Sequence, residues 1–175
     1  MISLIQSTLL FLAFTGLGMP TKESPDRDIE LVNQVLSTSV KIIQKKHNLR
    51  ACGAGVSMPG GPIRELTLSF SSNKLFLKEE LRKILISAAH EMVQLVNNNK
   101  EIQQYLFQAL FTEKNVQIII FNHDANGRGV FDPEIAVAEI SKGTLAYATE
   151  DSQNTFGYKN EFTETYEEAL RAINE

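Results

Sequence analysis

The segment that most constrains the fold is residues 78–97, which have the spacing of a long amphipathic helix. On a helical wheel its apolar side chains cover an arc of about 180°, which is wide for a helix at a protein surface. We therefore expect this helix to lie across a β-sheet with another element along its flank. The arc contains Leu81, Ile84, Leu85, Ala88, Ala89, Met92, Val93, Leu95 and Val96.

Two segments have the patterns of strands in that sheet. Residues 66–71 alternate between large apolar and hydroxyl side chains, and the turn signal Pro59-Gly60-Gly61-Pro62 precedes them, which indicates a β-hairpin with one solvated face. Residues 116–121 are apolar on both faces apart from Gln117, which predicts a central strand.

The order of expected elements indicates the fold class. A helix over residues 26–46 precedes the hairpin, and a second helix over 98–111 follows the long one. After the central strand we expect a short helix or strand within 132–141, then strands at 144–149 and 156–160 and a final helix from Thr165. The prediction is an α+β fold with a mostly antiparallel sheet of four to five strands and amphipathic helices packed on one face.

The N-terminus has the pattern of an export signal. Residues 1–21 carry no charged side chain, and an apolar run at 9–14 is followed by the small residues Gly16 and Gly18. We expect a signal peptide over 1–18, a linker over 19–25 and a single α+β domain over 26–175. An uncleaved membrane anchor or an ordinary buried helix are the alternatives for the first segment.

Composition excludes several classes of protein. The chain has 175 residues, 17 Lys and Arg against 21 Asp and Glu, and a formal net charge of −4, which argues against nucleic acid as a partner. Its single cysteine, Cys52, excludes an intrachain disulfide framework and a cysteine-based zinc site. We expect Cys52 to be a small buried side chain.

One loop resembles the first half of a calcium-binding loop. Oxygen-bearing side chains alternate at Asn122, Asp124 and Asn126, with Gly127 in the sixth position, and the next carboxylates are Asp132 and Glu134. The twelfth position is proline instead of glutamate, so the match is half a motif. A polar turn after a central strand is the other interpretation.

Catalytic motifs are weak in this sequence. No Gly-x-Ser-x-Gly elbow is present, and the His90-Glu91 pair lacks the second histidine that a helical zinc site requires. An enzyme would need a site assembled in three dimensions around Asn122–Gly129 and His90. We therefore expect no cofactor, apart from calcium in the 122–134 loop.

The C-terminal segment is the first candidate for a contact surface. Acidic residues outnumber basic ones from residue 150 onward, and Tyr158, Phe162 and Tyr166 lie among them. The sequence thus predicts an exported, non-catalytic binding or accessory module with a protein partner, and membrane contact only if the N-terminal segment is retained. A small enzyme and a calcium-stabilised module are the alternatives.

The export hypothesis predicts the start of the mature protein. N-terminal sequencing of the exported fraction should begin at Met19, because Gly16 and Gly18 have the spacing that signal peptidase recognises. A cytosolic product that retains Met1 would contradict the hypothesis.

Overall fold

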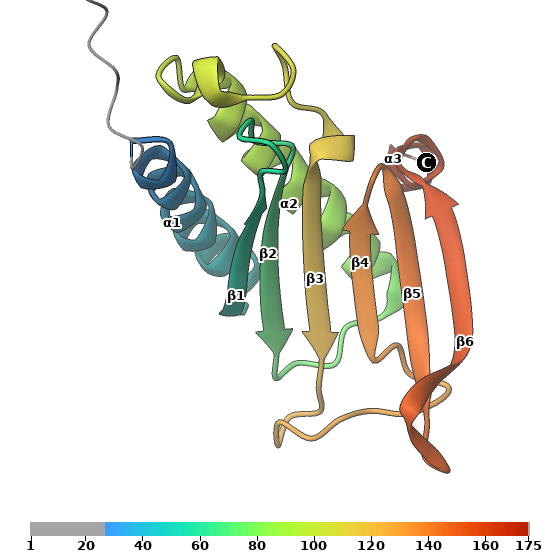
Figure 1. Cartoon of the computed structure of the whole chain (residues 1–175). Coiled ribbons are helices and arrows are strands. Elements are labelled where there is room, and N and C mark those ends of the chain that lie inside the picture. Colours follow the sequence, from blue (N-terminus) through green and yellow to red (C-terminus); the bar gives the residue numbers. More distant parts are fainter. Residues whose placement is uncertain (1–26, 175) are drawn as a thin grey trace, which may run out of the picture.

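The described residues of the chain form one six-stranded sheet with three α-helices, as a computed structural model shows (Figure 1). The structure describes residues 27–174, except the side chains of residues 155 and 156, and the predicted signal segment lies outside the described residues. The helices are α1 (Arg27–His47), α2 (Lys78–Asn98) and α3 (Tyr166–Asn174). The strands are β1 (Arg50–Ser57), β2 (Glu65–Ser72), β3 (Val116–Asn122), β4 (Val137–Ser141), β5 (Thr144–Asp151) and β6 (Asn154–Thr165).

The strands follow one another across the sheet in the order of the chain. Four of the five pairings are antiparallel, and β2 and β3 are parallel because α2 connects them as a crossover. The α+β class and the mostly antiparallel sheet are therefore confirmed. The expected four to five strands are too few, because residues 137–141 form a strand and residues 154–165 also join the sheet. This last strand is longer than the predicted 156–160.

All three helices pack against the same face of the sheet (Figure 1). Alternate strand residues point toward them, so Leu66, Leu68 and Phe70 of β2 and Ile118 and Ile120 of β3 are fully buried. The apolar arc of α2 covers these side chains, and Leu81, Leu85, Ala88, Ala89, Met92 and Val96 are fully buried. Among the described residues, no helix has both the length and the apolar character required to cross a membrane.

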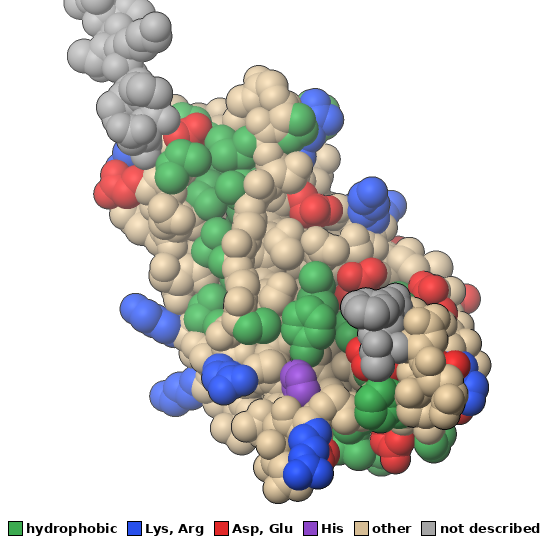
Figure 2. Space-filling view, turned by 60° about the horizontal axis from the view of Figure 1, so that its bottom comes forward, with side chains coloured by type: hydrophobic (Ala, Val, Ile, Leu, Met, Phe, Trp, Pro, Cys, Tyr) green, Lys and Arg blue, Asp and Glu red, His purple; other side chains and the backbone are tan. Residues whose placement is uncertain are grey.

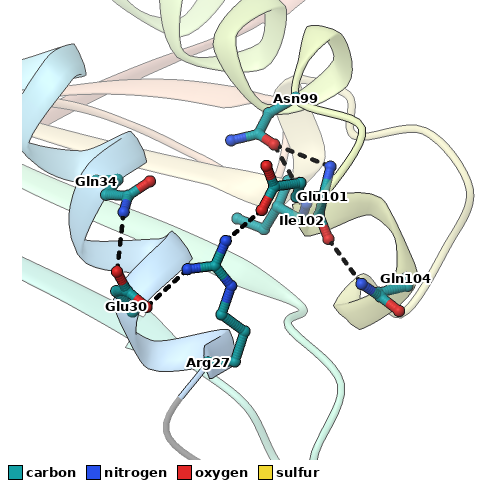
Figure 3. Close-up of polar contacts among 7 residues, drawn as sticks. All are labelled: Arg27, Glu30, Gln34, Asn99, Glu101, Ile102 and Gln104. Atoms are coloured by element: carbon teal, nitrogen blue, oxygen red, sulfur yellow. Dashed lines mark hydrogen bonds and ion pairs between the residues drawn. The ribbon is translucent and has the colours of Figure 1, made fainter. Parts of the chain in front are cut away.

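A polar cluster at the start of α1 joins this helix to the loop after α2 (Figure 3). The guanidinium group of Arg27 donates to the carboxylates of Glu30 and Glu101. The side-chain oxygen of Asn99 accepts the backbone N–H groups of Glu101 and Ile102, at 3.0 and 3.3 Å. These contacts fix the chain as it leaves α2.

The predicted second helix over 98–111 is wrong beyond a single 3-10 turn, η1 (Ile102–Tyr105). The side chain of Asn97 accepts the N–H of Phe111 and donates to its carbonyl, at 2.8 and 2.9 Å. Because this asparagine closes the segment into a loop, a continuous helix is not formed.

In segment 132–141, residues 137–141 form strand β4 and no helix is present. The N–H of Ala136 donates to the carbonyl of Ala148, and the carbonyl of Ala136 accepts the N–H of Asn122, both at 2.8 Å. These bonds continue the pairing of β4 with β3 and β5, so the extended alternative of the sequence prediction is the correct one.

A nearly buried ionic cluster ties α2 to β6. The Glu164 carboxylate accepts from Nε of Arg82 at 2.9 Å and from the hydroxyl of Tyr147 at 2.6 Å. Burial is the largest single influence on Glu164 and opposes ionisation, but the two hydrogen bonds and the Arg82 charge together outweigh it and lower the pKa of this carboxyl. Burial and the contact with Glu164 raise the pKa of Tyr147.

Glu164→Gln should destabilise the protein by about 1–3 kcal/mol at pH 7, because it leaves a buried hydroxyl and a largely buried guanidinium without their charged acceptor. A glutamate whose pKa is lowered by folding stabilises the native state above its unfolded pKa of about 4.3 and stops doing so as pH falls. Urea unfolding should therefore show a difference between wild type and variant that shrinks below about pH 4. The exposed Glu167→Gln is the control, and an equal loss in both variants would contradict the account.

Candidate functional site

The sheet face opposite the helices is uncovered in the part of the chain that the structure describes (Figure 1). On β1 and β2 this face carries small or hydroxyl-bearing residues, such as Gly53, Gly55, Thr67 and Ser69. On β3, β4 and β6 it carries larger side chains such as Ile119, Glu139 and Glu161, which surround the two alanines of β5. The two halves of the face therefore differ in chemistry.

Two apolar side chains of the central strand point to the uncovered face. Ile119 is half-buried, and Phe121 leaves 38% of its surface exposed, although β3 has a strand on either side. Large apolar groups on an uncovered sheet face are typical of a binding surface. The exposed Phe121 is the first sign that this face has a function.

A shallow hollow of about 140 Å³ lies beside these residues. Its floor is Ala146 and Ala148 of β5, whose methyl groups leave room that longer side chains would fill. Its walls are the side chains of Val137 and Glu139 on β4 and of Tyr158 and Glu161 on β6.

Strand register puts the two glutamates at opposite corners of the hollow. Glu139 pairs with Ala146, and Glu161 pairs with Ala148, two residues further along the same strand. The two carboxylates therefore come from strands about 10 Å apart across the sheet. A group inserted between them lies within reach of both.

Neither carboxylate is paired with a cation of the part of the chain that the structure describes. Among the described residues, Glu139 and Glu161 form no ion pair, and the neighbouring Lys159 is occupied by Asp132 at 3.0 Å. Figure 2 shows hydrophobic side chains in the middle of the visible surface, with acidic side chains to the right of them and others at the upper left. We call the six hollow residues, together with Ile119 and Phe121, the open-face site.

The structure gives Asn122 of the predicted calcium loop a different set of contacts. Its amide is buried, accepts the N–H of Phe76 at 3.0 Å and donates to the carbonyls of Phe76 and Ile135 at 2.9 and 2.8 Å. Asn122 thus links the end of β3 to the loop before α2 and to the loop before β4. Its side-chain oxygen already accepts the hydrogen bond from Phe76.

The other candidate calcium ligands have contacts of their own. Asp124 accepts the backbone N–H groups of Asn126 and Arg128 at 2.8 Å, and these bonds lower the pKa of Asp124. Asp132 contacts Lys159 and Asn160, and Glu134 is exposed. In the described part of the chain, no three His, Cys, Asp or Glu residues are grouped closely enough to hold a metal.

The three aromatic residues of the predicted contact surface lie in different places. Tyr158 lines the open-face hollow, with 57% of its surface exposed. Phe162 pairs with Tyr147 and points to the helix side, where Lys78 Nζ lies 5.3 Å from its ring. Tyr166 is half-buried at the start of α3, so only Tyr158 belongs to the open-face site.

His90 and the 122–129 loop lie at opposite ends of β3. His90 lines a cavity with Phe111 and Glu113, just before β3 begins, whereas the loop follows its last residue. The structure therefore does not bring together the two parts of the alternative enzyme site. Cys52 is exposed in a bulge of β1, and the expectation that it is buried is wrong.

Comparisons with known protein families, with curated proteins and with solved structures give no match to this chain. Its function must therefore be inferred from its own residues.

Asn122→Ala should lower the free energy of unfolding by about 3 kcal/mol, because it leaves buried backbone groups of Phe76 and Ile135 without partners. Thermal or urea unfolding measures this loss. The exposed Asn126→Ala is the matched control, for which we expect a change within about 0.5 kcal/mol. Equal losses for the two variants would show that Asn122 is not a structural link.

Proposed function

We propose that the chain is a non-catalytic binding module whose open-face site receives an arginine or lysine side chain of a protein partner. The observation that supports this most directly is the hollow itself, in which an alanine floor lies between two glutamates that form no ion pair with any described residue. Such a hollow accommodates the aliphatic stem of a basic side chain, while its charged end lies between the carboxylates. The ring of Tyr158 adds a wall that favours a cation.

The size of the site favours a protein segment over a small-molecule substrate. At about 140 Å³ the hollow is smaller than the cavities of roughly 300–1,000 Å³ that enclose drug-sized ligands. It has room for one side chain, and Ile119 and Phe121 continue the surface beyond it. The whole site therefore suits a partner that inserts one basic side chain into the hollow and packs apolar side chains on Ile119 and Phe121.

Charge favours a basic partner over a second copy of this chain. In a face-to-face pair, Glu139 would be buried near the middle of the interface. Of the basic residues on the described strands, Arg50 lies on this face, and Lys159 at the bulge of β6 is already paired with Asp132. A carboxylate buried without a cation is costly, so self-association through this face is disfavoured.

We also propose, from the N-terminal pattern, that the module acts after export. The partner is then a basic segment of another exported or envelope protein. This step rests on the sequence pattern of residues 1–18 alone and is independent of the open-face site.

The double variant E139Q/E161Q should bind a basic peptide about ten-fold more weakly than the wild type, because two partly exposed ion pairs are lost. A capped pentapeptide of alternating valine and arginine is the probe, and calorimetry or fluorescence anisotropy gives the affinity. Binding should also weaken with rising salt.

Two controls separate recognition from general attraction. The variant E79Q/E167Q removes the same charge from exposed positions on α2 and α3 and should leave the affinity unchanged. A peptide with citrulline in place of arginine keeps the shape but loses the charge and should bind weakly. Equal loss of affinity in both double variants, or equal binding of both peptides, would refute the proposed function.

A further inference from the structure

A second cavity, of about 280 Å³, lies where β1 begins and β2 ends. Its lining comes from the α1–β1 connection, from the ends of these two strands and from the loop that leads to α2. The lining residues are Asn48, Leu49, Arg50, Ser71, Asn73 and Lys74. Strand β3 lies between β1 and β2, which line this cavity, and β4 to β6, which line the open-face hollow, so the two are separate.

The polar lining of this cavity is rich in hydrogen-bond donors. Two cationic side chains, two amides and one hydroxyl line it, and none of its lining residues is acidic. Lys74 forms an ion pair with Glu80 at 2.9 Å, which compensates its charge. Arg50 forms no ion pair with any described residue, so it supplies the uncompensated positive charge.

Ser71 is the second sign that the cavity holds a ligand. Its side chain is almost completely buried, with 6% of the residue exposed. Its Oγ accepts a hydrogen bond from the Nε–H of Arg50 at 3.3 Å. Among the described residues, no acceptor takes the hydrogen of this hydroxyl. A buried hydroxyl beside a cation, with its own donor still free, is suited to an anionic acceptor.

We propose that this cavity binds the phosphoryl group of a small phosphate monoester. Arg50, Ser71 and Asn73 approach it from β1, β2 and the following loop, and so from three directions. A tetrahedral phosphate presents acceptor oxygens to all three, whereas a planar carboxylate is satisfied by the arginine fork alone. The volume leaves room for a small organic group beyond the phosphate.

Inorganic phosphate is the probe, titrated at constant ionic strength into the ¹⁵N-labelled full chain. Saturable shifts should appear at the Arg50 Nε–H and at the backbone N–H groups of Ser71 and Asn73. Arg50→Gln should weaken phosphate binding about ten-fold or more, and Ser71→Ala by about three- to ten-fold, because each removes a donor to a charged acceptor.

Matched variants and a second anion make the result decisive. Ser69→Ala changes the same residue type on the same face of β2, two residues earlier, and Lys41→Gln removes an exposed positive charge on α1. Both should leave phosphate binding unchanged. Because Arg50 is exposed, Arg50→Gln should fold normally, which its urea midpoint checks. Absence of saturable shifts, or shifts that Arg50→Gln leaves intact, would overturn the site, and equal binding of acetate would overturn its assignment to phosphoryl groups.

Discussion

The packing of every helix on one face of the sheet is the constraint on which the rest of this structure depends. A six-stranded sheet has two faces, and α1, α2 and α3 supply apolar surface for one of them. The core therefore lies between α2 and the inward side chains of the strands, and the other face meets solvent. The same constraint gives the open-face site its position, because small, hydroxyl-bearing or acidic residues surround the few apolar ones there.

Glutamate has a different role on each of the two faces of β6. Glu164 points inward and is satisfied by Arg82 and Tyr147, so it stabilises the fold. Glu161 points outward, next to an alanine floor, and has no ion pair among the described residues. Burial with partners makes the first carboxylate structural, whereas exposure without a cation leaves the second free for a ligand.

The sequence predicts the parts of this fold that depend on local periodicity. The helix over residues 78–97, the hairpin and the central strand appear where the spacing of apolar residues places them. The segment after α2 could not be predicted because Asn97 bonds to Phe111, fourteen residues away, and closes a loop. The open-face site depends on strand register, which sets Glu139 and Glu161 around Ala146 and Ala148. Tyr158 is the one residue of that site that the sequence indicated. The apolar residues on both faces of strand 116–121 were a signal for the rest, because Ile119 and Phe121 are among them.

The structure of the complex with the valine–arginine peptide tests the central claim most directly. The account predicts that a guanidinium group lies within about 4 Å of the carboxylates of Glu139 and Glu161, with its stem over Ala146 and Ala148. A peptide seated elsewhere, for example in the 440 Å³ cavity lined by Leu75, Leu77 and Pro133 at the start of α2, would contradict it.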